Sequence, residues 1–273
     1  MSEIEYSSGF STLSPELETL LMSEAKPLLL NPEGASDAAI VCLHGYSGTP
    51  YEVQPVAQAI AECGMTAIVP LLPRHGYRER KEQELQFALV TKSGLLGAAR
   101  QEIDRARHQY RYVGAFGFSM GGALALSMAA EGRLDACVVT APALDLPRQA
   151  NILIPLLSWA SFTLEAPLEE PFHVPKYEFH HSRALRTLWQ VARHARQGLR
   201  HIRCPVLGMH SRTDPVIPPV VLGLMQQSIP RAIETAWFDD SGHSMQLDVS
   251  GGAVAQRASQ FFLDRLSTEL SEY

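Results

Sequence analysis

The chain has 273 residues, of which 46% are hydrophobic and 19% charged, and its formal net charge is −6 at pH 7. This composition is typical of a folded globular protein and excludes extensive disorder. The net negative charge gives no general affinity for nucleic acid or for anionic membranes. The first residues form neither a basic segment nor an apolar one, and no apolar run reaches the length of about 18 residues that a membrane span needs. We therefore expect a cytoplasmic protein without stable membrane insertion.

The four cysteines lie in or beside apolar runs, at positions 42, 63, 137 and 204. Their spacings match neither a zinc site nor a dense disulfide framework, so we expect buried thiols. No metal and no cofactor is expected from the cysteine pattern or from the rest of the sequence. The oligomeric state is not indicated by the sequence.

Residues 1–20 are polar and aperiodic, and the pattern assigns them no role. The run Leu28-Leu29-Leu30 predicts an edge strand. From residue 38 onward short apolar runs alternate with longer helical patterns, which favours a mostly parallel, doubly wound α/β sheet. The predicted strands are 38–43, 66–70, 112–116, 136–140, 205–209 and 233–238. The predicted helices are 52–63, 84–107, 120–131, 183–199, 220–227 and 254–266.

The interval 146–182 interrupts this alternation. It contains the apolar block 152–157, then Trp159 and Phe162, then a segment punctuated by prolines. A structureless loop of this length is uncommon inside a compact domain, and the interval follows the carboxyl end of a strand, where doubly wound folds bind their ligands. We interpret it as a cap over the active site, inserted into a single domain spanning 1–273. The alternative is a peripheral helix packed on the sheet.

A nucleophilic serine is predicted within residues 117–122, Gly-Phe-Ser-Met-Gly-Gly, which lie between a predicted strand and a predicted helix. An abrupt turn from strand to helix strains the backbone and exposes the hydroxyl of Ser119 at the edge of the sheet. Gly117 and Gly121, two positions away on either side, allow strand and helix to approach closely. The pattern Gly-x-Ser-x-Gly also arises by chance, so its position between strand and helix carries the inference.

A serine hydroxyl needs a base within hydrogen-bond reach and an acid that orients that base. Asp214 follows the predicted strand 205–209, and His243 follows the last predicted strand, so both lie at the same sheet edge as Ser119. The chain order Ser, Asp, His is that of α/β-hydrolases rather than of chymotrypsin or subtilisin. The sequence thus predicts a catalytic triad of Ser119, Asp214 and His243.

Alternatives exist for two members of this triad. Asp240, and less plausibly Asp239, lie nearer to His243 in sequence than Asp214 does. The rival histidines are His44, His75 and His210. We interpret His44 as supporting a loop and His210 as the end of a strand.

An acyl-transfer site also needs donors for the oxyanion of the tetrahedral intermediate. Residues 44–50, His-Gly-Tyr-Ser-Gly-Thr-Pro, directly follow the predicted strand 38–43. We expect the backbone N–H groups of Tyr46 and Met120 to be the two donors.

These motifs resemble the carboxylesterases and monoacylglycerol lipases of the α/β-hydrolase superfamily. The resemblance rests on His44-Gly45, on residues 117–122, on Asp214 before Val-Ile-Pro and on Gly-His-Ser around His243, and it covers roughly residues 38–268. It implies an α/β-hydrolase fold with a small cap after the family's sixth strand. It also implies hydrolysis of short- to medium-chain carboxylic esters without a metal. In the loop 71–76, Arg74 stands where the family has a glycine, which affects the expected substrate preference.

The sequence is thus interpreted as a serine ester hydrolase acting on a small-molecule ester, with Leu153, Leu156, Trp159 and Phe162 of the cap forming part of the acyl-binding wall. A thioesterase, an amidase or peptidase, or a carbon–carbon bond hydrolase would use the same triad. A ligand-binding receptor or scaffold that retains the fold is the alternative from another class. Two basic groups are interpreted as solvated surface, although the first could attract anionic substrates. The first comprises Arg74, Arg78, Arg80 and Lys81, and the second the arginines at 183, 186, 193, 196, 200 and 203.

Overall fold

The computed structural model describes residues 13–157, 159–166 and 174–266. Within these residues a seven-stranded sheet has the strand order β1-β3-β2-β4-β5-β8-β9. β1 is antiparallel to β3, and the other neighbouring pairs are parallel. The strands are β1 (Leu28–Leu30), β2 (Ala38–Leu43), β3 (Thr66–Val69), β4 (Tyr112–Phe118), β5 (Ala136–Thr140), β8 (Val206–His210) and β9 (Glu234–Trp237). The predicted mostly parallel sheet and its edge strand are therefore confirmed.

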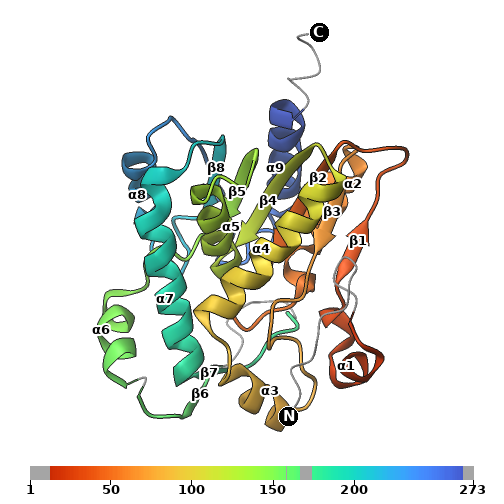
Figure 1. Cartoon of the computed structure of the whole chain (residues 1–273). Helices are drawn as coiled ribbons and strands as arrows, with labels where there is room; N and C mark the ends of the chain where they lie inside the picture. Colours follow the sequence, from red (N-terminus) through yellow and green to blue (C-terminus); the bar gives the residue numbers. More distant parts are fainter. Residues whose placement is uncertain (1–12, 158, 167–173, 267–273) are drawn as a thin grey trace.

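Helices cover both faces of this sheet (Figure 1). Alternate strand residues divide between two cores: Val41 packs in one with residues of α4, α5 and α7, and Ile40 packs in the other with residues of α2 and α9. The α-helices are α1 (Pro15–Leu20), α2 (Gln54–Glu62), α3 (Arg80–Phe87), α4 (Lys92–Gln109), α5 (Met120–Ala130), α6 (Arg148–Leu157), α7 (Ser182–Gly198), α8 (Val220–Ser228) and α9 (Gly251–Leu266). Three short 3-10 helices are labelled η1 (Ser23–Ala25), η2 (Pro50–Val53) and η3 (Leu199–His201). Among the described residues no helix is both long and apolar enough to span a bilayer.

The single helix predicted over 84–107 is wrong, because the chain forms two helices, α3 and α4, in this region. Thr91 adopts an extended conformation between them, and its side chain accepts a hydrogen bond from the N–H of Gly94. Such a cap satisfies an N–H group that has no partner inside the helix. Phe87, the last residue of α3, and Val90, in the connection between the two helices, are both buried, so their apolar character continued the helical pattern into the break.

The N-terminal segment, to which the sequence assigned no role, includes a short helix. Ser14 caps α1 by accepting a hydrogen bond from the N–H of Leu17, and Pro15 occupies the first turn. Leu17 and Leu21 are buried in a small apolar cluster that also contains Tyr77. The part of this segment before residue 13 lies outside the described residues. The described part therefore covers the loop that leads into α3.

The interval 146–182 contains α6 and a two-stranded antiparallel sheet formed by β6 (Thr163–Glu165) and β7 (Phe179–His181). It follows β5, which is the fifth strand in the described part of the chain. Residues 158 and 167–173 of the interval lie outside the described residues.

Of the four free cysteines, Cys42 and Cys137 are buried as predicted, whereas Cys63 and Cys204 are partly exposed.

Candidate active site

Ser119 occupies a sharp turn between β4 and α5. Its backbone has φ 52° and ψ −113°, a region that residues with side chains adopt only at a cost. Three backbone hydrogen bonds hold this conformation: Ser119 donates to Thr140 at 2.9 Å and accepts from Ala123 at 3.1 Å and Ala143 at 2.9 Å. The turn conformation thus depends on the neighbouring strand and on the first turn of the helix.

The glycines around Ser119 allow a close approach of backbone to backbone. A Cβ atom on Gly117 would overlap the backbone of Gly121, and one on Gly121 would overlap the backbone of Leu43 and His44 at the end of β2. The first turn of α5 therefore lies directly against the start of the loop that follows β2. This loop, residues 44–49, is called the oxyanion loop below because it contains Tyr46, one of the two expected oxyanion donors.

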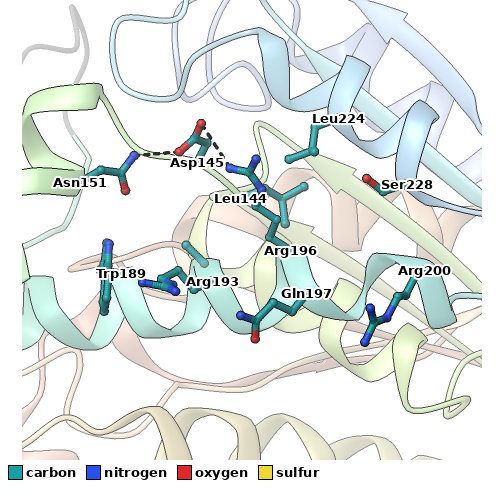
Figure 2. Close-up of a pocket in the computed structure, with 11 residues that line it drawn as sticks. Leu144, Asp145, Asn151, Trp189, Arg193, Arg196, Gln197, Arg200, Leu224 and Ser228 are labelled. Carbon is teal, nitrogen blue, oxygen red and sulfur yellow. Dashed lines mark hydrogen bonds and ion pairs between the residues drawn. The ribbon is translucent and has the colours of Figure 1, made fainter.

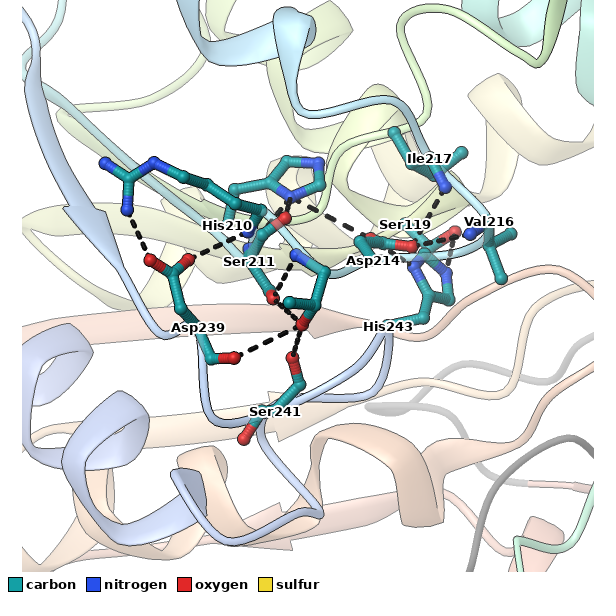
Figure 3. Close-up of polar contacts among 11 residues, drawn as sticks. Ser119, His210, Ser211, Asp214, Val216, Ile217, Asp239, Ser241 and His243 are labelled. Atoms are coloured by element: carbon teal, nitrogen blue, oxygen red, sulfur yellow. Dashed lines mark hydrogen bonds and ion pairs between the residues drawn. The ribbon is translucent and has the colours of Figure 1, made fainter.

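The structure brings Ser119, His243 and Asp214 together from three different loops (Figure 3). His243 Nδ1 lies 2.8 Å from Asp214 Oδ2, and His243 Nε2 lies 3.1 Å from Ser119 Oγ. A carboxylate can only accept, so Nδ1 carries the proton and Nε2 is left to accept the hydroxyl proton of Ser119. This arrangement can activate the serine hydroxyl as a nucleophile.

Asp214 is buried, and its two carboxylate oxygens have different partners. Oδ1 accepts hydrogen bonds from the N–H groups of Val216 at 2.7 Å and Ile217 at 3.0 Å, while Oδ2 faces His243. Burial by itself raises the pKa of Asp214, but the hydrogen bond from His243 and the two backbone N–H groups hold that pKa below its usual range. The carboxylate is therefore ionised and can stabilise a protonated His243.

The rival acids and histidines have other partners. Asp239 is exposed and pairs with Arg212, and Asp240 is exposed in the same loop. His210 is buried at the end of β8, where its Nδ1 lies 2.8 Å from the Ser211 carbonyl oxygen and 3.8 Å from Asp214 Oδ2 (Figure 3). Burial lowers the pKa of His210, so this side chain is neutral beside the acid.

His44 and His75 also bond to backbone groups. His44 Nε2 accepts a hydrogen bond from the N–H of Leu72 at 3.0 Å, and His75 Nδ1 lies 2.9 Å from the carbonyl oxygen of Pro73. Burial lowers the pKa of both rings, that of His75 to about 4. Among the described histidines, His243 is the one that hydrogen-bonds to Ser119.

Of the two expected oxyanion donors, Met120 directly follows Ser119 and Tyr46 lies in the loop after β2. Met120 is the first residue of α5, and the N–H groups of a first helical turn have no acceptor within the helix. Tyr46 lies in the oxyanion loop, and its ring packs against Phe87, with 4.9 Å between ring centroids, and against His180. Among the described residues no cluster of three or more histidine, cysteine or acidic side chains could hold a metal ion.

The cap residues expected to line an acyl pocket are largely exposed. Leu153, Leu156 and Trp159 are 50%, 62% and 81% exposed, and Phe162 is half-buried. Ile154, on the same helix, is the side chain that packs into the core. The acyl-binding role of the four residues stays a prediction.

A groove of about 690 Å³ lies between α6, α7 and α8 and is separate from the triad (Figure 2). Arg193 and Arg196 of α7 and Arg200 of η3 line it. Arg193 lies over the ring of Trp189, and Arg196 lies 3.6 Å from Asp145. The six arginines of this region are all exposed, as predicted.

In the other basic group, three arginines make hydrogen bonds or ion pairs with neighbouring residues of the chain. Arg74 donates to Gln86, Arg78 donates to the carbonyl oxygen of Leu21, and Arg80 pairs with Glu84 and Glu165. Arg74 has φ +68°, in the left-handed region that favours glycine. These arginines therefore connect the loop to its neighbours rather than form a free basic patch.

Two residues near the site were missed in the sequence. Tyr177 donates its N–H to the carbonyl oxygen of Ser47 and accepts, at its hydroxyl, a hydrogen bond from the N–H of Tyr77. It lies far from both partners along the chain, so no local pattern could identify it. Glu52 is buried and accepts a hydrogen bond from the N–H of Gly45. An acidic residue shortly after the His-Gly pair was the available signal.

Comparisons with known proteins agree with the predicted α/β-hydrolase fold. The profile of a family described as the alpha/beta hydrolase family matches residues 40–257. A thermostable monoacylglycerol lipase from Bacillus sp. (strain H-257) is 26% identical over 258 residues, covering 88% of this chain and 98% of that protein.

Solved structures with the same fold include one of the metagenome-derived lipolytic enzymes LipS and LipT, with a TM-score of 0.80 and 23% identity over 88% of this chain and 98% of that one. Another is the monoacylglycerol lipase of Paleococcus ferrophilus, with a TM-score of 0.70 and 14% identity over 88% and 98% of the two chains. The structural likeness confirms the predicted fold class.

Proposed function

The chain belongs to the α/β-hydrolase family, and from this membership together with the geometry at Ser119 we propose that it is a serine carboxylic ester hydrolase. The observation that carries the proposal is the placement of His243 between Ser119 and Asp214, at 3.1 Å and 2.8 Å. The name of the Bacillus relative, a monoacylglycerol lipase, supports an ester as the substrate.

In the first half of the reaction the Ser119 Oγ attacks the ester carbonyl carbon while His243 Nε2 takes the hydroxyl proton. Asp214 holds the ring and stabilises the imidazolium that forms. The carbonyl oxygen becomes an oxyanion, which the N–H groups of Tyr46 and Met120 bind. The intermediate then collapses: the bond from carbon to the alkoxy oxygen breaks, His243 gives its proton to that oxygen, and the alcohol leaves. The acyl group remains on Ser119.

In the second half a water molecule attacks the acyl-enzyme, and His243 accepts a proton from it. A second oxyanion forms and is bound by the same two N–H groups. When it collapses, the bond between carbon and the Ser119 oxygen breaks, and the proton on His243 returns to that oxygen. The products are a carboxylic acid and the free enzyme, so no external oxidant, reductant or metal enters the balance.

For the substrate we propose short- to medium-chain acyl esters whose acyl chain contacts the cap. Leu153, Leu156 and Trp159 are exposed apolar side chains on one short segment, and exposed apolar groups of this kind mark binding surfaces. Phe162 continues this segment toward β6. Each acyl methylene covered by these side chains contributes about 0.8 kcal/mol to binding.

A panel of substrates tests the proposal. We expect p-nitrophenyl esters and monoacylglycerols of short to medium chain length to have higher kcat/KM values than the matched acyl thioesters, anilides and β-diketones. Higher values for a thioester, an anilide or a diketone would identify instead a thioesterase, an amidase or a carbon–carbon bond hydrolase. Absence of turnover on every member of the panel would favour a ligand-binding protein.

A further inference from the structure

A carboxylate is buried beneath the oxyanion loop. Glu52 belongs to η2, directly after the loop, and is only 3% exposed. Its Oε2 atom accepts a hydrogen bond from the backbone N–H of Gly45 at 2.8 Å. Buried carboxyl groups are costly unless they have hydrogen-bond partners, so this contact constrains both the side chain and the loop.

The other side of the same residue is held by His44. Because His44 Nε2 accepts the N–H of Leu72, the ring proton is on Nδ1, which lies 3.0 Å from the Gly45 carbonyl oxygen and donates to it. In a trans peptide the C=O of Gly45 and the N–H of Tyr46 are rigidly opposed. Fixing the Gly45 carbonyl therefore fixes the direction of the Tyr46 N–H.

The loop also wraps closely around the Glu52 carboxylate. A Cβ atom on Gly48 would overlap that carboxylate, and a Cβ atom on Gly45 would lie 3.1 Å from Glu52 Oε2 and equally close to the ring of Phe118. Phe118 immediately precedes Ser119. The carboxylate, the oxyanion loop and the strand that carries the serine thus form one packed unit.

We propose that Glu52 is a positioning residue that holds Gly45, and through it the Tyr46 N–H, in the orientation that binds the oxyanion. This inference rests on the proposed hydrolase function. Its role requires a hydrogen-bond acceptor of the right length rather than a negative charge. Because the oxyanion exists only in the transition state and the tetrahedral intermediate, loss of Glu52 lowers kcat and leaves KM nearly unchanged.

The first test compares Glu52→Ala with Glu52→Gln, and uses Glu62→Ala, an exposed position on the adjacent α2, as the matched control. Values of kcat are normalised to active serine by titration with a burst substrate, so a misfolded fraction does not count. Deleting an oxyanion donor costs about 10²- to 10³-fold in kcat, and for its misorientation in Glu52→Ala we expect about 10- to 100-fold. Glu52→Gln recovers most of that loss. Equal kcat in wild type and Glu52→Ala overturns the proposal.

A second test uses the contact between Gly48 and the carboxylate. Gly48→Ala alone forces Glu52 aside and lowers kcat, whereas in the Glu52→Ala background the added methyl group meets no carboxylate and has little further effect. Strong non-additivity is expected of residues in direct contact. If the fold-losses in kcat of the two single variants multiply in the double variant, the proposed contact between Gly48 and the Glu52 carboxylate is contradicted.

A third readout does not depend on catalysis. Hydrogen exchange of the Gly45 amide accelerates in Glu52→Ala, but remains slow in Glu52→Gln and Glu62→Ala. Unchanged exchange in Glu52→Ala overturns the positioning role even if activity falls. If the wild-type protein hydrolyses no ester while the exchange pattern is as expected, the proposed function fails and the structural role of Glu52 stands.

Discussion

At the scale of single residues, the candidate site depends on the different partners of the two carboxylate oxygens of Asp214. The N–H groups of Val216 and Ile217 hold Oδ1, which leaves Oδ2 aimed at His243 Nδ1. Neither Asp239 nor Asp240 has such support, because both are exposed and Asp239 already pairs with Arg212. The structure therefore favours Asp214 as the acid that orients the base.

Exchange of each acid for its amide tests this assignment. Asp214→Asn preserves the shape of the side chain but favours the wrong tautomer of His243, and the equivalent change in the worked serine-protease triad lowers kcat by about 10⁴-fold. We expect a loss of this order, with Asp240→Asn as the matched control that keeps most of the activity. Steady-state kinetics on purified, folded variants check it. The reverse ranking would move the acid to Asp240.

The proximity of Ser119, Asp214 and His243 could be predicted because each follows a recognisable apolar strand and parallel strands end at one sheet edge. Glu52 and Tyr177 could not be assigned in this way. Their positions depend on a buried hydrogen bond to Gly45 and on a contact with Ser47. The contact with Ser47 has no local sequence signal, and the signal for Glu52 is limited to its place shortly after the His-Gly pair. Hydropathy treats a buried glutamate as a surface residue, since burial of a charge is uncommon without partners.

At the scale of elements, the turn at Ser119 was readable because glycines mark the backbone contacts that its geometry needs. The break between α3 and α4 was not readable, because buried Phe87 and Val90 continued the helical pattern across the cap at Thr91. The cap was predicted as an insertion, but its buried face was not: Ile154 packs inward, while Leu153 and Leu156 are exposed. Hydrophobicity alone does not distinguish a residue that packs in the core from one that meets a ligand.

A prediction at this scale concerns the exposed apolar segment of the cap. If Trp159 covers the acyl chain of a bound substrate, Trp159→Ala shifts the preferred p-nitrophenyl ester to a different chain length and lowers kcat/KM for the longer members. The exposed side chain contributes little to the folded core, so stability should remain nearly constant. Profiles of kcat/KM against chain length measure the effect. Unchanged profiles for alanine variants at 153, 156, 159 and 162 would place this segment away from the substrate.

At the scale of the whole molecule, buried neutral histidines contribute to the dependence of stability on pH. Burial lowers the pKa of His44, His75 and His210 in the folded chain, that of His75 to about 4, whereas an unfolded histidine has a pKa of about 6.5. Between these values the unfolded state binds protons that the folded state does not. The free energy of unfolding therefore falls as pH decreases from about 6.5 toward 4, and these groups cause no dependence above neutrality.

Urea denaturation at pH 7.5, 6.0 and 5.0 measures this slope. Each unit of pKa difference corresponds to about 1.4 kcal/mol once the proton is fully bound in the unfolded state. Asp214, whose folded pKa is lowered, loses its stabilising contribution in the same direction at still lower pH. His75→Asn, which cannot be protonated, should give a shallower slope than the wild type. A free energy of unfolding that stays constant from pH 7.5 to 5.0 would contradict the neutral, buried state of these rings.

The central claim is that Ser119, activated by His243, is the nucleophile. Reaction with a fluorophosphonate followed by peptide mass spectrometry tests it most directly, because the reagent captures the serine oxygen itself. We predict one covalent adduct on the peptide that carries Ser119, no adduct in Ser119→Ala, and a rate reduced by several orders of magnitude in His243→Ala. An adduct on another residue, or none on a folded wild-type protein, would contradict the account.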